Sequence, residues 1–174
     1  MIRQALPGDL DAIAALHARA RATYYAGRIP EEAYAGAAEL ARTREGWSTA
    51  LQRAQSEGDG EGGAGGGVLC SVEDGELTGV AAYRPVDGRM TLTQLHVEPA
   101  HWRRGVGTAL HTGCRDAWLR AGVPRVRLDV YEHNLRAQAF YAAHGWRPDP
   151  AVPSAGSHIA LWLTLDPGPA ASGE

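Results

Sequence analysis

Three short apolar segments in the middle of the chain are separated by tight-turn sequences, and this pattern restricts the possible folds more than any other feature. The segments cover residues 68–72, 77–85 and 90–97, and the separators EDGE and VDGR each contain an Asp-Gly pair. Asp-Gly favours two-residue hairpin turns, because both central positions need a positive φ. The sequence therefore predicts an antiparallel meander of three strands.

Helices and strands surround this meander on both sides. Apolar residues at helical spacing predict the helices, and Asn134 and Gly145 are typical of the first and last residues of the final one. The predicted order is a strand at 1–6, helices at 7–27 and 30–55, the three strands, a helix at 106–122, a strand at 125–131, a helix at 134–145, and one or two strands within 146–149 and 158–165.

The chain is long enough for one well-buried core. It has 174 residues, of which 44% are hydrophobic, and we expect a single domain over residues 1–165. The tract SEGDGEGGAGGG, residues 56–67, has almost nothing to bury and is expected to be a flexible surface loop within that domain. Residues 166–174 are expected to form a frayed tail.

Composition excludes several classes of protein. The sequence has no uninterrupted apolar stretch of membrane-spanning length and no apolar leader at its start, so we expect a cytoplasmic protein without membrane contact. The two cysteines are far apart and the seven histidines are scattered, which indicates neither a disulfide framework nor a metal site. The net charge of -3 does not indicate nucleic-acid binding.

The segment RRGVGT, residues 103–108, lies between a predicted strand and a predicted helix. Glycines let the backbone approach a ligand, and the first turn of a helix favours an anion, so a phosphate is the expected occupant. A plain tight turn is the alternative. In a dinucleotide-binding interpretation, Gly105 and Gly107 begin a GxGxxG motif and Asp129 holds a ribose. However, Leu110 replaces the third glycine, and hairpins precede the turn instead of a βαβ unit.

Two longer motifs are more specific than the glycine pair. LHVEPAHWRRGVGTAL, residues 95–110, fits L-x-V-x-P-x-x-(Q/R)-x-x-G-x-(G/A)-x-x-L except at Trp102, and VYEHNLRAQAFYAAHGW, residues 130–146, fits V-x-x-x-N-x-x-A-x-x-F-Y-x-x-x-G-(F/W). With both motifs, the chain resembles the GNAT superfamily of N-acetyltransferases over essentially its whole length. The resemblance implies the α+β fold of that superfamily: a mixed, mostly antiparallel sheet of six to seven strands, flanked by about four helices and splayed between the fourth and fifth strands.

The resemblance also implies acetyl-CoA as co-substrate, with no metal. The pantetheine is expected to enter the splay and pair with the backbone of Leu95 and Val97. Asn134 either contacts the cofactor or caps its helix. Trp102 replaces the usual Gln or Arg, so that side-chain contact is lost. The expected pyrophosphate ligands are Arg103, Arg104, Gly105, Val106, Gly107 and Thr108. The two arginines are equally well explained as surface residues.

Acetyl transfer to an amine needs a polarised thioester, a proton for the departing thiolate and an acceptor for the amine proton. By resemblance, the Val97 N–H points at the thioester oxygen and Tyr141 acts as general acid, although Tyr141 also fits a packing role beside Phe140 and Trp146. Family members with a base on the strand before the glycine motif carry it where this chain has Thr91 or Thr93, and threonine cannot take the proton. The remaining base candidates are Asp129, Glu132, His96 and His133. Of these, Asp129 is preferred.

The predicted function is transfer of an acetyl group from acetyl-CoA to the primary amine of a small molecule or peptide, by direct attack in a ternary complex. A non-catalytic acyl-CoA-binding sensor is the alternative, because the strand-borne base is missing. The net charge slightly favours a cationic acceptor. The residues expected around the acceptor are Tyr24, Tyr25, Thr91 and Thr93, with Trp47 as either a pocket or a core residue.

The oligomeric state stays open at this stage. Members of the superfamily are often dimers, and residues 158–165 have the composition of an apolar edge strand that can pair across an interface. A homodimer is therefore one expectation, beside a monomer.

Overall fold

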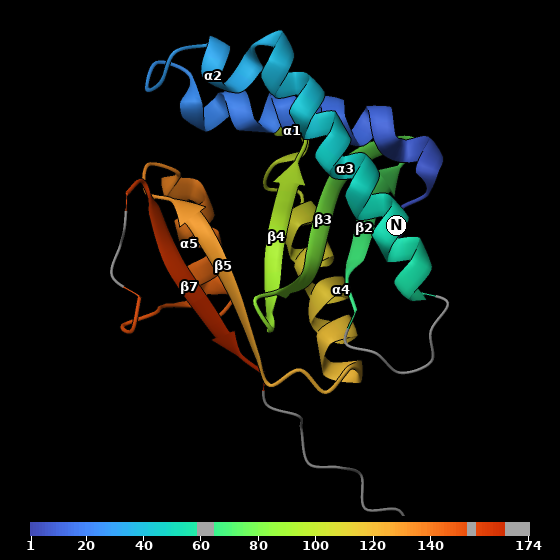
Figure 1. Ribbon diagram of the computed structural model, residues 1–174, viewed down its shortest axis with the longest axis vertical. Helices are drawn as coiled ribbons and strands as arrows, with labels where there is room; N and C mark the ends of the chain where they lie inside the picture. The colour runs from blue at the N-terminus through green and yellow to red at the C-terminus, as the bar shows by residue number, and fades with distance from the viewer. Residues whose placement is uncertain (59–64, 153–155, 166–174) are drawn as a thin grey trace, which may run out of the picture.

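The computed structural model describes residues 1–58, 65–152 and 156–165. Within them, the strands form one seven-stranded sheet in the order β1-β2-β3-β4-β5-β7-β6, with helices on both faces (Figure 1). The strands are β1 (Ile2–Gln4), β2 (Gly67–Glu73), β3 (Glu76–Val86), β4 (Arg89–Val97), β5 (Arg125–Tyr131), β6 (Arg147–Pro148) and β7 (His158–Thr164). The helices are α1 (Leu10–Tyr25), α2 (Glu32–Ala35), α3 (Ala37–Gly58), α4 (Val106–Arg120) and α5 (Leu135–Ala143).

The predicted meander is confirmed. Strands β2, β3 and β4 pair in antiparallel fashion. Both connecting turns have positive φ at the Asp-Gly pair, with 50° and 83° at Asp74 and Gly75, and 49° and 75° at Asp87 and Gly88. These left-handed dihedrals are what a two-residue hairpin turn requires, so the turn residues dictate the meander locally.

The sheet splits between β4 and β5. These strands run parallel, and the register gives one pair between them, Thr91 with Arg127. Beyond that pair the two strands diverge toward α1, as Figure 1 shows. The mixed sheet and its splay between the fourth and fifth strands are therefore as predicted. The split leaves backbone groups of β4 without a strand partner on that side, which positions the site described below.

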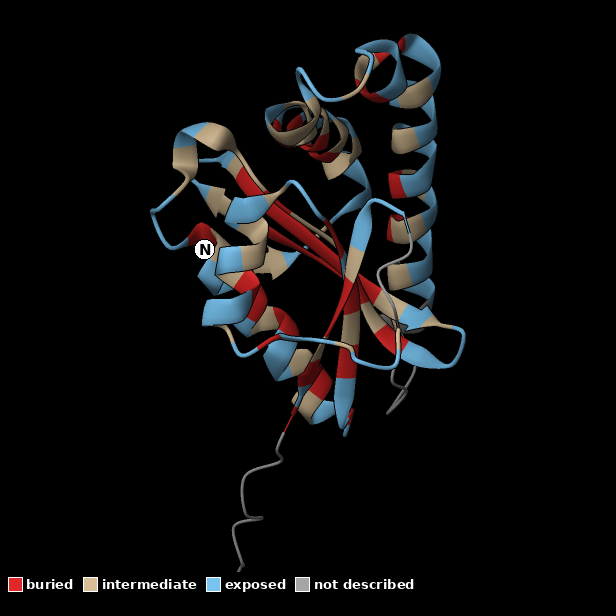
Figure 2. Cartoon of the chain, turned by 90° about the vertical axis from the view of Figure 1, so that its left-hand side faces the viewer, coloured by how far each residue is buried: buried red, intermediate tan, exposed pale blue. Residues whose placement is uncertain are grey.

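Two apolar cores lie on opposite faces of the sheet. Along β3, Val80 and Ala82 belong to the core beneath α1 and α3, whereas Ala81 and Tyr83 belong to the core beneath α4. This alternation follows from the two-residue period of a strand. Figure 2 shows buried residues concentrated along the strands and on the sheet-facing sides of the helices. The sheet is thus covered on both faces, with the split as its opening.

Some predicted boundaries were wrong. One helix was predicted from residue 30, but the chain forms α2 and then α3, because Gly36 leaves the helical region with a ψ of 153°. The loop predicted over 56–67 is shorter, since α3 continues to Gly58 and β2 begins at Gly67; residues 59–64 and the predicted tail, 166–174, lie outside the described residues. β7 is not a bare edge strand, because β6 pairs with it at Trp162 and Leu161.

Candidate active site at the sheet split

Two cavities meet at the split. The first, called here the roof cavity because α1 and α3 cover it, has a volume of about 530 Å³. The second, the turn cavity, has a volume of about 260 Å³ and lies between the β4–α4 turn and α5. The residues that line both cavities, and so mark where the two join, are Tyr24, Leu95, His96, Asn134, Ala137 and Tyr141.

The backbone of β4 presents hydrogen-bonding groups to the split. Glu98 donates its N–H to the Thr78 carbonyl at 2.9 Å, on the β3 side. Because N–H groups alternate between the two edges of a strand, those of Leu95 and Val97 face away from β3, toward the split. Both residues line the turn cavity. They therefore have the orientation expected for binding an extended ligand and polarising its carbonyl group.

The turn after β4 has the geometry of an anion site. Arg103 and Gly105 adopt left-handed backbone conformations, with φ of 61° and 82°. Gly105 is the N-cap of α4 and provides no side chain for its first N–H groups, which favours an external acceptor there. A Cβ at Gly107 would approach the Phe140 ring to 3.3 Å, so only glycine fits without displacing a neighbour. The turn residues present thus suit a phosphate.

Most of the predicted turn ligands line the turn cavity, but one does not. The cavity wall includes Arg103, Gly105, Val106, Gly107 and Thr108. Arg104 is exposed and is not part of either cavity wall. Its expected role at the phosphate therefore gains no support, and its surface role explains it better.

An arginine that sequence reasoning missed lies on the ring of Trp102. The Arg136 guanidinium carbon is 3.1 Å from the Trp102 ring centre, and the indole N–H donates to the Val97 carbonyl at 3.0 Å. Burial lowers the pKa of Arg136, and none of the described carboxylates pairs with it. The wall of the turn cavity contains Arg103 and Arg136 and, among described residues, neither Asp nor Glu. The cavity is therefore cationic.

Asn134 and Tyr141 project from α5 to the junction of the cavities. Asn134 accepts a hydrogen bond from the Ala137 N–H at 3.1 Å, so the helix-cap interpretation is confirmed, and Asn134 also lines both cavities. Tyr141 packs against Phe140 and Trp146, with ring centres 5.4 and 5.7 Å apart. Burial raises the pKa of Tyr141, so its hydroxyl stays protonated at neutral pH and can donate. The packing role of Tyr141 is thus confirmed, whereas the cofactor contact of Asn134 and the acid role of Tyr141 stay predictions.

Two buried histidines form part of the roof cavity. His17 on α1 and His96 on β4 stack with ring centres 4.0 Å apart, and His17 accepts a hydrogen bond from the Trp47 indole at 2.9 Å. Burial lowers the pKa of His17 to about 4 and the pKa of His96 well below its usual value. His96 also donates to the Gln94 side chain at 2.6 Å. Both rings are therefore neutral, and His96 is a poor proton acceptor.

The other base candidates differ in position. Asp129 lines the roof cavity, with 49% of its side chain exposed, and accepts from Arg127 at 3.1 Å. Glu132 and His133 are exposed, pair with each other at 3.5 Å, and line neither cavity. The structure therefore brings Asp129, but neither Glu132 nor His133, to the place where an acceptor amine would lie.

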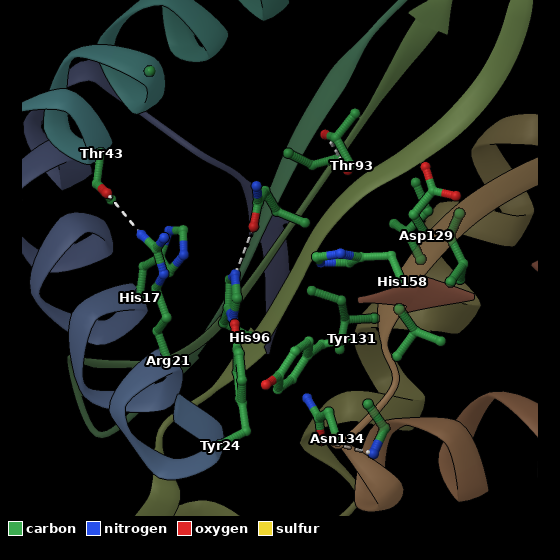
Figure 3. Close-up of a pocket in the computed structure, with 18 of the residues that line it drawn as sticks. His17, Arg21, Tyr24, Thr43, Thr93, His96, Asp129, Tyr131, Asn134 and His158 are labelled. Atoms are coloured by element: carbon green, nitrogen blue, oxygen red, sulfur yellow. Dashed lines mark hydrogen bonds between the residues drawn. The ribbon is translucent and has the colours of Figure 1, made fainter. Parts of the chain in front are cut away.

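The predicted acceptor residues mostly gather in the roof cavity. Tyr24, Tyr25, Trp47 and Thr93 line it, and burial raises the pKa of Tyr24 to about 12. Thr91 does not line the cavity, because it pairs with Arg127 at the place where β4 and β5 are still joined. Figure 3 shows the walls of this cavity.

Sequence reasoning missed several lining residues. Of these, His17 and Arg21 share one face of α1 with the predicted Tyr24, and their spacing was a usable signal. His158 on β7, and Glu39 and Arg42 on α3, gave no local signal. Within the described ranges, no helix combines the length and apolar character of a membrane span, and no group of three or more His, Cys, Asp or Glu side chains is arranged to hold a metal.

Comparisons with known proteins agree with this geometry. The chain superposes on PaiA N-acetyltransferase from Thermoplasma acidophilum, a complex with coenzyme A, with a TM-score of 0.83, 19% identity, and coverage of 95% of this chain and 98% of the other. Aminoglycoside 6'-acetyltransferase type Ii superposes with a TM-score of 0.71 and 17% identity, over 97% of this chain and 99% of the other. The ribosomal-protein-S18-alanine N-acetyltransferase from Escherichia coli superposes with a TM-score of 0.59 and 21% identity, over 94% of this chain and 92% of the other.

The sequence comparison gives the family. No curated protein matches the chain in sequence. The acetyltransferase (GNAT) family profile matches residues 31–146, which include the β4–α4 turn and all of α5. With a split sheet, a phosphate-type turn and this match over most of its length, the chain belongs to the GNAT family of acetyltransferases.

Proposed function

We propose that this acetyltransferase moves an acetyl group from acetyl-CoA to a primary amine by direct attack, with both substrates bound, in a single catalytic domain over residues 1–165. The observation that carries the proposal is the junction of the two cavities at Leu95, His96 and Tyr141. A thioester arriving along the turn cavity and an amine arriving through the roof cavity meet there. An arrangement with separate access for two substrates favours a ternary complex over a covalent enzyme intermediate.

The turn cavity supplies the groups for the acetyl donor. The first-turn N–H groups of α4 hold the pyrophosphate, with Arg103 and Arg136 as nearby cations. The backbone of Leu95 pairs with the pantetheine, and the Val97 N–H donates to the thioester oxygen as it gains negative charge. The protonated Tyr141 hydroxyl then donates to the departing thiolate sulfur.

The roof cavity supplies the groups for the acceptor. Asp129 faces this cavity, where it attracts the incoming ammonium and takes its proton through water before the neutral amine attacks. The C–N bond forms as the C–S bond breaks. The proton that the acetylated nitrogen still has to lose replaces the one that Tyr141 passes to the thiolate, so coenzyme A leaves as a thiol and Tyr141 stays protonated. The pairing of Asp129 with Arg127 keeps the carboxylate on this wall.

Initial-rate kinetics with released thiol as the readout test the proposal. Varying acetyl-CoA at several amine concentrations is expected to give intersecting double-reciprocal lines, as a ternary complex requires, whereas parallel lines indicate a covalent acetyl-enzyme. Acetyl-CoA binding without thiol release from any amine would identify a sensor instead. Binding of a nicotinamide dinucleotide in place of coenzyme A would reject both.

A further inference from the structure

One wall of the roof cavity has more positive than negative charge. Arg21 and Arg42 share a single carboxylate, that of Glu39, with N–O distances of 2.5 and 2.6 Å. The hydrogen bond from Arg21 lowers the pKa of Glu39, so this carboxylate is ionised at neutral pH. All three residues line the cavity. The Arg-Glu-Arg cluster therefore carries one positive charge that no described side chain balances.

Arg84 adds a second unbalanced charge to the cavity. It lines the roof cavity from β3, is half-buried, and donates only to the Pro85 carbonyl, at 3.2 Å; no carboxylate of the described residues lies within ion-pair distance. The part of the wall that α3 contributes includes Gly46 and Ala50. A Cβ placed on Gly46 would have no neighbour within 4 Å, so there is open space beside this part of α3.

The β5 side of the cavity carries a carboxylate, that of Asp129, which pairs with Arg127 at 3.1 Å. Asp129 on β5 faces the cavity beside His158, across from Arg21 and Thr43 (Figure 3). The charges are thus separated, with an excess of arginine on the α1, α3 and β3 side and a carboxylate on the β5 side. A ligand with several cationic groups would meet Arg21, Arg42 and Arg84, whose charges Glu39 offsets only in part, and one further carboxylate, Asp129. A ligand with one ammonium and one carboxylate matches both walls.

From this distribution we infer that the acceptor is a short peptide with a free amine and a free carboxylate, and that Arg84 binds the carboxylate. The inference rests on the proposed acetyl transfer and names its substrate class. It also reverses the slight preference for a cationic acceptor that the net charge suggested, because the local charges act at shorter range than the net charge.

The strand register favours a peptide over a free amino acid. Arg84 lies opposite Thr91, six residues before Val97. At about 3.3 Å per residue, these β4 positions are roughly 20 Å apart, a distance that the Arg84 side chain shortens. The amine and carboxylate of a single α-amino acid are too close together to occupy both places. An extended tripeptide, about 10 Å long, covers the part of the distance that the Arg84 side chain does not span.

A matched pair of acceptors tests the inference: a tripeptide with a free carboxylate and the same tripeptide amidated at its C-terminus. The two differ in one charge. Thiol release gives kcat/KM for each, and calorimetry gives the affinity of each for the CoA-loaded protein. We expect the free acid to exceed the amide at least tenfold in both measurements, and spermidine to be poorer than either peptide.

Variants assign the preference to Arg84. In Arg84→Gln the ratio of acid to amide is expected to fall to near one, and in Arg84→Lys, which keeps the charge, most of the ratio should return. Arg53→Gln makes the same change on the exposed part of α3, outside the cavity wall, and should keep the wild-type ratio. Circular dichroism of each variant verifies that it is folded.

The outcomes separate this inference from the proposed function. Equal use of acid and amide, or a preference for spermidine, would overturn the inference while leaving acetyl transfer intact. Arg84-dependent binding of the acid to the CoA-loaded protein, without thiol release, would support the carboxylate site and reject the enzyme. If the acid neither binds nor causes thiol release, both the inference and the proposed acetyl transfer are overturned.

Discussion

His17 and His96 come from different elements and stack with their ring centres 4.0 Å apart, between the helical roof and the sheet. Burial is the main cause of the lowered pKa of each ring, and the positive charge of Arg21 adds to it. The Trp47 indole donates to His17, which fixes the proton of that ring on its other nitrogen. The stack is therefore a neutral contact that protonation would break.

This contact predicts a loss of stability in mild acid. Because the folded-state pKa values lie below the value of about 6.5 in the unfolded chain, the unfolded state binds more protons below pH 6.5. The stabilisation is complete above that pH and declines as the pH falls toward 4. Between pH 7 and pH 5, each such histidine is expected to reduce the free energy of unfolding by about 2 kcal/mol.

Urea unfolding at pH 7 and pH 5 measures this effect. His96→Gln removes one buried titrating ring, so its stability should differ less between the two pH values than that of the wild type. His133→Gln alters an exposed ring and should keep the wild-type difference. A difference that is the same in all three proteins would mean that the stacked rings titrate normally.

Replacing Tyr141 by phenylalanine tests the general acid. The ring packing on Trp146 is preserved while the hydroxyl is lost, so kcat should fall at least about tenfold, and the dissociation constant of acetyl-CoA should change less than twofold. Tyr34→Phe, a buried tyrosine outside both cavities, is the matched control. An unchanged kcat in Tyr141→Phe would remove this hydroxyl from the mechanism.

Gly107→Glu tests the phosphate turn. The new side chain would crowd Phe140 and place a negative charge at the start of α4, so acetyl-CoA affinity should fall at least about a hundredfold. Gly8→Glu introduces the same charge where a Cβ meets nothing within 4 Å, and calorimetry should give wild-type affinity for it. Wild-type affinity in Gly107→Glu would mean that the phosphates bind elsewhere.

Arg136→Ala tests whether the cation on Trp102 recognises phosphate. Affinity for coenzyme A should fall about tenfold, and Arg136→Lys should recover part of it, because a lysine keeps the charge but not the planar stack. S-acetylpantetheine, which has no phosphates, should bind the wild type and Arg136→Ala equally. An equal loss for both ligands would show that Arg136 only supports the packing of Trp102.

Local signals in the sequence were enough to predict the scaffold. The Asp-Gly turns at 74–75 and 87–88 gave the meander, and the motifs around Gly105 and Asn134 gave the turn cavity and the start of α5. These features depend on residues close together in the chain. The split between β4 and β5 followed from the family resemblance and not from any residue pattern.

Contacts between distant segments could not be predicted. Glu39 joins Arg21 and Arg42 only after α1 and α3 pack together, and Arg84 enters the same cavity from β3. The Trp102–Arg136 stack likewise forms only when the segment before α4 and the first turn of α5 come together. None of these side chains belongs to a periodic pattern that points to its partner, so the charge of the roof cavity becomes visible only in three dimensions.

The most direct test of the central claim is a thiol-release assay with acetyl-CoA over a panel of amines, with the acetylated product identified by mass spectrometry. We expect saturable thiol release that requires both substrates, with the acetyl group found on the amine. Saturable acetyl-CoA binding with no acetylated product from any amine would contradict it.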